Sequence, residues 1–378
     1  MLGTDSRAFV VDSETYRRFT EYAELGEELH CFIYVGPRKD LSLTRPAANV
    51  FLYPIACGRL NYFLRAYRAV AKKLSLDTSS AWVITAQDPF ETGIVATILS
   101  WRFKIPFQLQ IHTDFLSPYF ARESIKNRLR AIYGLYLARR ASGLRVVSLR
   151  IKQSLINRGI MAEKIQVLPI MSRPTESKTK TSEKIIAELR GDHDLVFLIA
   201  SRLTREKNIS LAIRALSAAV FEKNPAKRNP LLLIVGSGPE DQELRATVTH
   251  YGIGKHCRFV PWADNLKPYY QASDVFLLTS NYEGYGRTIV EALEAGLPVI
   301  TTDVGIAREM IVEGKNGHLI PIDDVYALGE SIKNVLNRKT KWSINHGKNY
   351  EPFASRAEYL LQYKNALTEI CHSRNSQS

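Results

Sequence analysis

Two carboxylates frame a glycine-containing turn in the stretch NYEGYGRTIVEAL, residues 281–293. Glu283 precedes the turn, and Glu291 follows it within an apolar run typical of a helix. The turn and the expected start of the helix consist of Gly284, Tyr285, Gly286, Arg287 and Thr288. Glycine allows bare backbone to approach a ligand, and the N–H groups at a helix start favour anions. The stretch therefore predicts a site for phosphate or sugar hydroxyls.

The two carboxylates suit different hydroxyl groups of a ligand. Glu283 lies on the loop, where it can accept hydrogen bonds from hydroxyls. Glu291 lies about one turn into the helix, at ~3.6 residues per turn. Its neighbours are apolar, and a carboxylate in such a place needs a partner. A ribose diol is a suitable partner. The alternative is that Glu291 and Glu294 mark the exposed edge of a surface helix.

A loop rich in cations follows the expected strand 195–200. Arg202 and Lys207 lie in this loop, just before a helix that is expected to begin at Ile209. Two cations beside the N–H groups of a helix start make a strong anion site, because the helix dipole adds to the charges. A solvated charged loop is the alternative interpretation.

A second turn, with Gly236 and Gly238, joins the expected strand 231–235 to a helix. Such a turn lets a ligand approach the backbone. However, Asp241 takes the place of the third glycine of the dinucleotide fingerprint, which argues against NAD. A purely structural turn is the alternative.

In the first half of the chain, three polar side chains follow expected strands. His112 and Asp114 come after the strand 107–111, and Asp88 comes after the strand 82–85. Ligands of open α/β sheets bind at the carboxyl ends of the strands. His112 is therefore a candidate to bind a sugar hydroxyl or a backbone carbonyl, and the two aspartates are candidates for an acceptor site. Most isolated histidines are nevertheless structural.

The elements that must position these residues alternate along the chain. Short apolar runs alternate with helical stretches, which is typical of parallel sheets covered by helices on both faces. A polar stretch rich in Ser, Thr and Lys interrupts the pattern after Pro169. We therefore expect an α/β protein with two Rossmann-like domains facing each other across a cleft. The expected parts are a first domain at 1–170, a linker at 171–194, a second domain at 195–345, and a C-terminal helical segment at 346–378 that packs back toward the first domain.

Taken together and in this order, the motifs resemble those of the retaining glycosyltransferases of family 4, which have the GT-B fold. The similarity covers most of the chain and is strongest from 195 to 335, in SRLTREKN, VGSGPEDQEL, EGYGRTIVE and EALEAGLPVITTDVG. The resemblance implies that Glu283 contacts the transferred sugar and that Glu291 holds the nucleotide ribose. It also implies that Arg202 and Lys207 neutralise the diphosphate and that His112 contacts the donor sugar. The first domain would then handle the acceptor, and the second would bind the nucleotide sugar.

The resemblance implies transfer of a sugar, with retention, from a UDP- or GDP-linked donor to a glycan or a polyprenyl-diphosphate-linked acceptor. Surface polysaccharide or glycolipid biosynthesis is the expected role. The nucleotide sugar is a co-substrate, and no other cofactor is expected. We expect no metal, because no DxD-like motif follows the strands and the cations can replace one. The alternatives are a nucleotide-sugar epimerase of similar fold and a nucleotide-binding protein without transferase activity. No nucleic-acid-binding motif is recognised.

The net charge of +13 is concentrated in one block. Residues 121–158 carry ten Lys or Arg and a single acid, which gives +9. A dense block of this kind suggests an anionic partner. Its residues Arg122, Lys126, Arg130, Arg139 and Arg140 are expected to form a patch that docks on an anionic membrane, beside apolar residues of the same helix. An ordinary amphipathic helix with a basic outer face is the alternative.

Other features favour a cytoplasmic protein, peripheral on the inner face of the plasma membrane. No stretch reaches the ~18 apolar residues of a membrane span. The first residues lack the layout of a signal peptide, and the four cysteines are far apart in the sequence. The first residues also lack the glycine pair that follows the first strand in relatives, which leaves the completeness of the N-terminus open.

Overall fold

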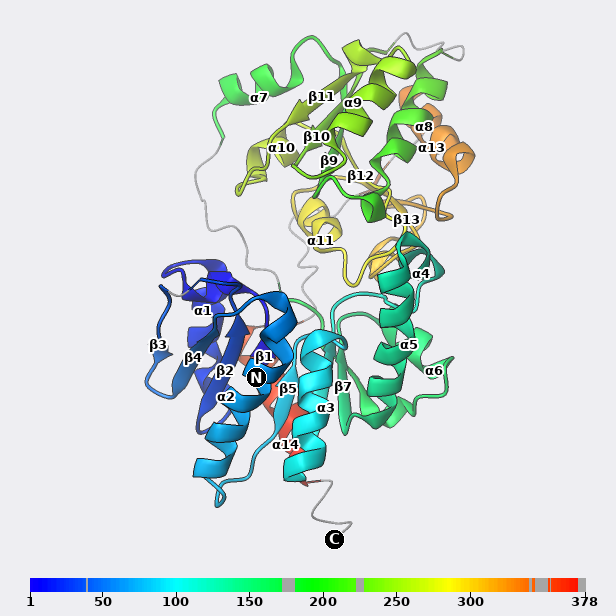
Figure 1. Ribbon diagram of the computed structural model, residues 1–378. Helices are drawn as coiled ribbons and strands as arrows, with labels where there is room; N and C mark the ends of the chain where they lie inside the picture. The colour runs from blue at the N-terminus through cyan, green and yellow to red at the C-terminus, as the bar shows by residue number, and fades with distance from the viewer. Residues whose placement is uncertain are drawn as a thin grey trace. The chain divides into compact units, whose positions relative to one another are not determined.

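The computed structural model describes residues 1–38, 40–171, 181–221, 228–339, 342–343, 353 and 355–372 (Figure 1). The chain forms two compact units. The first unit comprises Met1–Met171 and Phe353–Ser378, and the second comprises Ser172–Pro352. Much of the expected linker at 171–194 lies outside the described residues. Its described end carries helix α7 (Glu183–Arg190).

The first unit is built on one sheet. Among the described residues its strands run in the order β3-β4-β2-β1-β5-β6-β7-β8. Only β3 pairs antiparallel within this part of the chain, and it does so at the edge of the sheet. The strands are β1 (Leu2–Gly3), β2 (Leu29–Tyr34), β3 (Thr44–Ala47), β4 (Val50–Ile55), β5 (Ile84–Ala86), β6 (Phe107–Ile111), β7 (Gly143–Val146) and β8 (Ile165–Val167).

Helices connect and cover these strands. They are α1 (Glu14–Glu21), α2 (Tyr62–Leu76), α3 (Glu91–Phe103), α4 (Pro118–Glu123), α5 (Ile125–Arg140), α6 (Leu149–Ile156) and α14 (Arg356–His372), with short 3-10 turns η1 (Ser6–Phe9), η2 (Tyr22–Leu25), η3 (Arg59–Asn61) and η4 (Ala162–Lys164). The C-terminal helix α14 packs against η2 and touches β6. Its Tyr363 is fully buried and meets the ring of Tyr22 edge-on, with centroids 5.6 Å apart. This helix therefore completes the core of the first unit.

The second unit is also built on one sheet, which is parallel throughout the described residues, in the order β11-β10-β9-β12-β13-β14. The strands are β9 (Leu195–Ala200), β10 (Pro230–Val235), β11 (Cys257–Val260), β12 (Val275–Leu278), β13 (Val299–Thr302) and β14 (Gly317–Ile320). Side chains alternate between its faces: Phe197 joins the core on one side, and Val196 and Leu198 join the core on the other. Both faces are thus buried, as expected for a parallel sheet.

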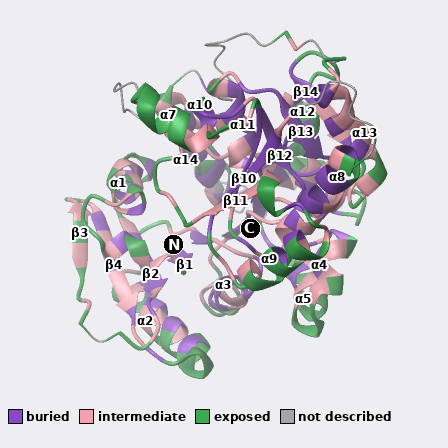
Figure 2. Ribbon diagram, turned by 90° about the horizontal axis from the view of Figure 1, so that it is seen from above, coloured by how far each residue is buried: buried purple, intermediate pink, exposed green. Residues whose placement is uncertain are grey.

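Helices cover this sheet on both faces, and Figure 2 shows the inner strands β12 and β13 in the colour of buried residues. The elements after α7 are η5 (Arg205–Lys207), α8 (Ile209–Phe221), α9 (Asp241–His250), η6 (Gly254–His256), α10 (Lys267–Gln271), α11 (Arg287–Glu294), α12 (Ala307–Met310) and α13 (Val325–Leu336). The predicted α/β class with two Rossmann-like domains is confirmed. The cleft between them stays a prediction.

Candidate functional site

The loops that follow β9 and β12 meet at the carboxyl edge of the second sheet, because these two strands are neighbours. The N–H of Asn281 donates to the carbonyl of Glu206 at 2.7 Å. The hydroxyl of Thr279 donates to the carbonyl of Lys207 at 2.9 Å. Asn208, at the start of α8, donates from Nδ2 to Asn281 Oδ1 at 3.0 Å. These bonds hold the cation-rich loop against the loop that leads into the glycine-containing turn.

Lys207 and Glu283 form an ion pair at this junction. Lys207 Nζ lies 2.5 Å from Glu283 Oε1, and the side chains are only 16% and 14% exposed. The hydroxyl of Ser280 donates to the same oxygen at 2.8 Å. Among the described residues, the hydrogen bonds from Lys207 and Ser280 both go to Oε1 of Glu283. An ammonium group has three donors, so Lys207 can hold Glu283 and still donate to an anion.

Arg202 is placed differently from Lys207. Its Nη2 donates to Glu206 Oε1 at 3.0 Å, and the side chain is 66% exposed. Glu206 also accepts from the hydroxyl of Thr204 at 2.7 Å. Of the two predicted cations, Lys207 therefore contacts Glu283, whereas Arg202 lies at the surface of the same loop.

The turn before α11 depends on glycine. Gly286 has φ 93° in the left-handed region and precedes the first residue of the helix, where glycine carries no steric cost. The side chain of Tyr285 is buried, and its carbonyl accepts from the N–H of Ile306 at 2.8 Å. Tyr285 therefore packs inward, and its carbonyl ties the turn to the residue before α12. Thr288 is half-buried in the first turn of the helix.

Glu291 is held by two side chains rather than lying freely at a helix edge. Arg287 Nε donates to its Oε1 at 2.6 Å, and the hydroxyl of Tyr270 donates to its Oε2 at 3.0 Å. Tyr270 comes from α10 and is buried. Burial, together with the neighbouring charge of Glu291, raises the pKa of Tyr270 well above its usual range, so it remains a donor. The sequence did not reveal Tyr270, which lies 21 residues away on another helix.

The Gly236–Gly238 turn packs tightly on the cation-rich loop. A Cβ on Gly236 would lie 1.8 Å from the carbonyl oxygen of Ser201, and one on Gly238 would lie 2.2 Å from that of Leu203. The N–H of Leu203 in turn donates to the carbonyl of Ser237 at 3.1 Å. The structural interpretation of this turn therefore accounts for both glycines.

In the first unit, His112 and Asp114 follow β6. His112 Nε2 lies 3.2 Å from Gln110 Oε1. Burial, with the positive charges of Arg145 and Arg18, lowers the pKa of His112 to about 3, so its ring is neutral near pH 7. Asp114 is buried, and burial raises its pKa to about 6. Its Oδ1 has no hydrogen-bond partner within the described residues.

Asp88 caps the start of α3. Its Oδ1 accepts from the N–H groups of Phe90 and Thr92 at 2.8 and 3.2 Å, and its Oδ2 accepts from the hydroxyl of Thr92 at 2.8 Å. Burial raises its pKa despite these bonds. The carboxylate satisfies free N–H groups at a helix start, and this local role explains its position after β5.

Two family models divide the chain between them. The model for "Glycosyl transferases group 1" matches residues 181–352, and that for "Glycosyl transferase 4-like domain" matches residues 14–170. The chain belongs to the group 1 glycosyltransferases. Among solved structures, the GT-B fold is shared with Anabaena HepE, determined in complex with UDP and glucose, at 21% identity and a TM-score of 0.68 over 98% of this chain and 99% of that one.

Curated relatives of this group 1 glycosyltransferase act on different substrates. The poly(glycerol-phosphate) alpha-glucosyltransferase of Bacillus subtilis is 29% identical over 47% of this chain and 26% of its own. The alpha-monoglucosyldiacylglycerol synthase of Acholeplasma laidlawii is 26% identical over 68% of this chain and 67% of its own. For three of the curated relatives, including the Bacillus subtilis enzyme, this chain matches only 26% to 37% of the relative's length, which is well under two thirds.

The predicted basic patch of this glycosyltransferase is partly rearranged. Arg130 turns inward, where its guanidinium pairs with Glu91 and lies 5.0 Å from the ring centroid of Phe90, because Glu91 in the first turn of α3 attracts it. Lys126 lies 3.8 Å from Glu91, and Arg139 donates to the carbonyl of Arg158 at 3.0 Å. Arg122, Lys126, Arg139 and Arg140 are exposed. Beside them α5 exposes the apolar side chains Ile125, Leu129, Ile132 and Tyr136.

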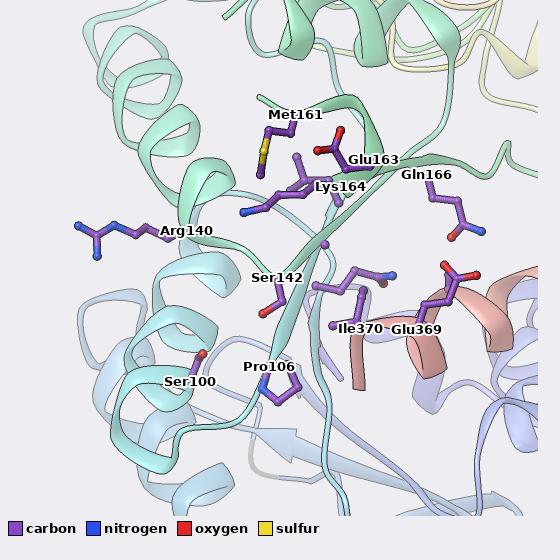
Figure 3. Close-up of a pocket in the computed structure, with 14 residues that line it drawn as sticks. Ser100, Pro106, Arg140, Ser142, Met161, Glu163, Lys164, Gln166, Glu369 and Ile370 are labelled. Carbon is purple, nitrogen blue, oxygen red and sulfur yellow. The ribbon is translucent and has the colours of Figure 1, made fainter. Parts of the chain in front are cut away.

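A pocket of about 630 Å³ lies elsewhere in the first unit (Figure 3). It is lined by residues at the amino ends of β6, β7 and β8 and by α14, including Pro106, Gly143 and Glu369. His112 and Asp88 follow the carboxyl ends of their strands, so the pocket lies at the opposite edge of the sheet. In the described part of the chain no helix is long and apolar enough to span a membrane, and no cluster of metal-binding side chains occurs.

Proposed function

We propose that this chain is a retaining glycosyltransferase that moves a sugar from a nucleotide-diphosphate sugar to a glycan or lipid-linked acceptor. The observation that carries the proposal is the Lys207–Glu283 pair, which lies beside the glycine-containing turn and the start of α11. This arrangement offers a cation and helix N–H groups to a diphosphate and a carboxylate to sugar hydroxyls. UDP is the favoured nucleotide, because HepE has been determined with UDP and glucose.

In the proposed reaction, the bond between the anomeric carbon and the diphosphate oxygen breaks, and the diphosphate leaves with an additional negative charge. Lys207 and the N–H groups at the start of α11 stabilise this charge, as preorganised donors do in other transferases. Oε2 of Glu283 accepts from a sugar hydroxyl. The acceptor oxygen bonds to the anomeric carbon on the same face, and its proton passes to the leaving phosphate oxygen. Front-face attack of this kind retains the configuration.

A thermal-shift panel of UDP-, GDP- and ADP-sugars tests the proposal. One nucleotide is expected to raise the melting temperature, because a ligand that binds only the folded state stabilises it. Glu291→Ala is expected to reduce that shift, whereas Glu294→Ala on the same helix is the matched control. A wild-type chain that none of these donors stabilises would argue against the proposal. Conversion of a donor to its epimer without an acceptor would favour the epimerase alternative.

We also propose that α5 docks on an anionic membrane, which would bring a lipid-linked acceptor within reach. Its exposed apolar residues follow a helical stripe, with Ile125 82% exposed and Ile132 64% exposed. Lys and Arg side chains flank this stripe. The neighbouring helix α3 exposes Trp101. Apolar side chains inserted between headgroups and cations beside them are what an interfacial helix requires.

Liposome flotation with and without anionic lipid tests this docking. The triple variant I125S/L129S/I132S is expected to lose most of the binding, and high salt is expected to weaken the binding of the wild type. Leu361→Ser on α14 is the matched control, because Leu361 is exposed in the same unit but far along the chain from α5. Wild-type binding that does not depend on anionic lipid would contradict the proposal.

A further inference from the structure

We propose that Arg145 is a positioning residue that, through Gln110, sets the tautomer of His112, so that the ring presents the lone pair of Nδ1 to a hydroxyl of the bound sugar. The inference rests on the proposed function together with the contact between His112 and the donor sugar that the sequence motifs imply. It specifies that His112 accepts the hydrogen bond in that contact, and it assigns a role to the buried Arg145 on β7.

The argument starts from Arg145, which is buried and can only donate hydrogen bonds. Its Nη1 donates to Gln110 Oε1 at 2.8 Å. The oxygen of this amide must therefore face the guanidinium. At its other end, Gln110 Nε2 donates to Thr85 Oγ1 at 2.9 Å and to the hydroxyl of Tyr363 at 2.5 Å. Both ends of the amide are satisfied in this orientation.

The orientation of Gln110 determines where His112 carries its proton. His112 Nε2 lies 3.2 Å from the same Oε1 that Arg145 contacts. A carbonyl oxygen can only accept, so Nε2 must carry the hydrogen. The ring is neutral, because burial and the charges of Arg145 and Arg18 disfavour a second proton. Nδ1 is then an acceptor, and it makes no hydrogen bond among the described residues.

The position of Arg145 is itself held by the C-terminal helix. Its Nη2 donates to the hydroxyl of Tyr359 at 2.9 Å, and its guanidinium carbon lies 4.5 Å from the ring centroid of Tyr363. The neighbouring hydroxyls of Tyr359, Tyr363 and Tyr22 favour its charged form and, against burial, raise its pKa above the usual range. Within the described residues no carboxylate pairs with Arg145.

Burial of an arginine without a carboxylate partner costs free energy, because a buried charge is stable only when it is paired or well hydrogen-bonded. A merely structural role therefore explains Arg145 poorly. Because the guanidinium of Arg145 can only donate, it holds the amide of Gln110 with its oxygen toward His112. Without Arg145, the amide could rotate and present Nε2 to the ring, since the hydroxyl of Tyr363 can also donate. His112 would then move its proton to Nδ1.

The test is the tautomer of His112, read from the nitrogen shifts of its ring in ¹⁵N-labelled full-length protein near pH 7. The wild type is expected to carry hydrogen on Nε2. Arg145→Met and Gln110→Met are expected to shift the population toward hydrogen on Nδ1, and Arg145→Lys is expected to restore the wild-type state in part. Gln153→Met is the control, because Gln153 is an exposed glutamine on α6 whose side chain bonds Asn157 and not Thr85 or Gln110.

A second readout separates this inference from the proposed function. With the donor chosen by the thermal-shift panel, Gln110→Met is expected to weaken binding of the nucleotide sugar roughly threefold to tenfold, as the loss of one hydrogen bond would. Binding of the nucleotide diphosphate alone should not change. Hydrogen on Nδ1 in the wild type, or an unchanged tautomer in a folded Gln110→Met variant, would overturn the inference. If the wild type binds no nucleotide sugar, the proposed function fails instead.

Discussion

The ammonium of Lys207 lies 2.5 Å from the carboxylate of Glu283, and each group neutralises the charge of the other in a largely buried place. The two residues are 76 positions apart in the chain. They meet because each follows one of two neighbouring strands, β9 and β12. The pair therefore has a structural role before any donor binds, and it also places a cation and a carboxylate side by side for the reaction.

Removal of one partner of this pair should destabilise the fold. Lys207→Met removes one hydrogen-bond donor from Glu283, whose side chain is only 14% exposed. We expect a loss of about 2–3 kcal/mol in the free energy of unfolding, somewhat less than for a fully buried pair. The double variant K207M/E283Q should lose less than the sum of the two single changes. Urea unfolding of the four proteins measures the coupling.

The control for this cycle is Arg308→Met, which breaks a pair with Asp303 in which the arginine is 74% exposed. Exposed pairs contribute at most about 1 kcal/mol. If Lys207→Met is no more destabilising than this control, the Lys207–Glu283 pair does not stabilise the fold.

The hydroxyl of Tyr270 should support nucleotide binding through Glu291. Tyr270→Phe removes the donor that lies 3.0 Å from Glu291 Oε2, so the carboxylate is held by Arg287 alone among the side chains that contact it in the described structure. We expect UDP to bind roughly threefold to tenfold more weakly, the effect of one hydrogen bond. Calorimetric titration with UDP and with 2′,3′-dideoxy-UDP measures this.

The dideoxy analogue lacks the hydroxyls that Glu291 is proposed to hold, so its weaker binding should not change further in Tyr270→Phe. Tyr269→Phe, which alters the preceding residue of α10, should leave both affinities at the wild-type value. An equal loss for both nucleotides would mean that Tyr270 acts on the fold rather than through Glu291.

The strands that carry the site could be predicted from the sequence because they are buried on both faces. β9 has the expected bounds, since its uninterrupted apolar run ends where a polar loop begins. β6 also has the expected bounds, although two glutamines alternate with its apolar residues. β1 has only two residues and β3 is a short edge strand, so neither produces a pattern that stands out from a loop. Their place in the sheet depends on pairing with strands far along the chain.

The site residues were recognisable as motifs, but their partners were not. Glu291 stood out as a carboxylate among apolar residues, yet Tyr270 reaches it from a separate helix. The alternating glutamines of FQLQI were the one local signal for the buried network, because polar side chains in a doubly covered strand need partners. Asp88 shows the reverse case, in which a polar residue after a strand caps a helix.

The glycines of the turn after β10 should be required for folding rather than for ligand approach. Gly236→Ala would place a methyl group 1.8 Å from the carbonyl oxygen of Ser201, and Gly238→Ala would place one 2.2 Å from that of Leu203. Both contacts are with backbone, which cannot easily move away. We expect each change to cost on the order of 3 kcal/mol or to prevent folding. Guanidinium unfolding measures this, with Gly254→Ala as the control because its Cβ would meet open space.

Asp114 should make the stability of the protein depend on pH. The residue is only 6% exposed, and burial raises its pKa from 3.8 to about 6, although Arg150 and the N–H groups of Leu116 and Ser117 act in the opposite direction. Between pH 3.8 and about 6 the folded chain therefore binds more protons at this residue than the unfolded chain does. The contribution of Asp114 to the free energy of unfolding must then fall as the pH rises through this window.

A rise of the pKa from 3.8 to about 6 corresponds to a full change of about 3 kcal/mol in the free energy of unfolding. Asp114→Asn removes the titration, so the variant should gain stability relative to the wild type by up to this amount between pH 4 and pH 7.5. Urea unfolding of both proteins across this range gives the difference directly. Asp192→Asn is the control, because that side chain is 89% exposed. A constant difference between Asp114→Asn and the wild type at all pH values would mean that the carboxyl group is ionised in the folded protein throughout, and that a cation or a set of donors compensates its burial.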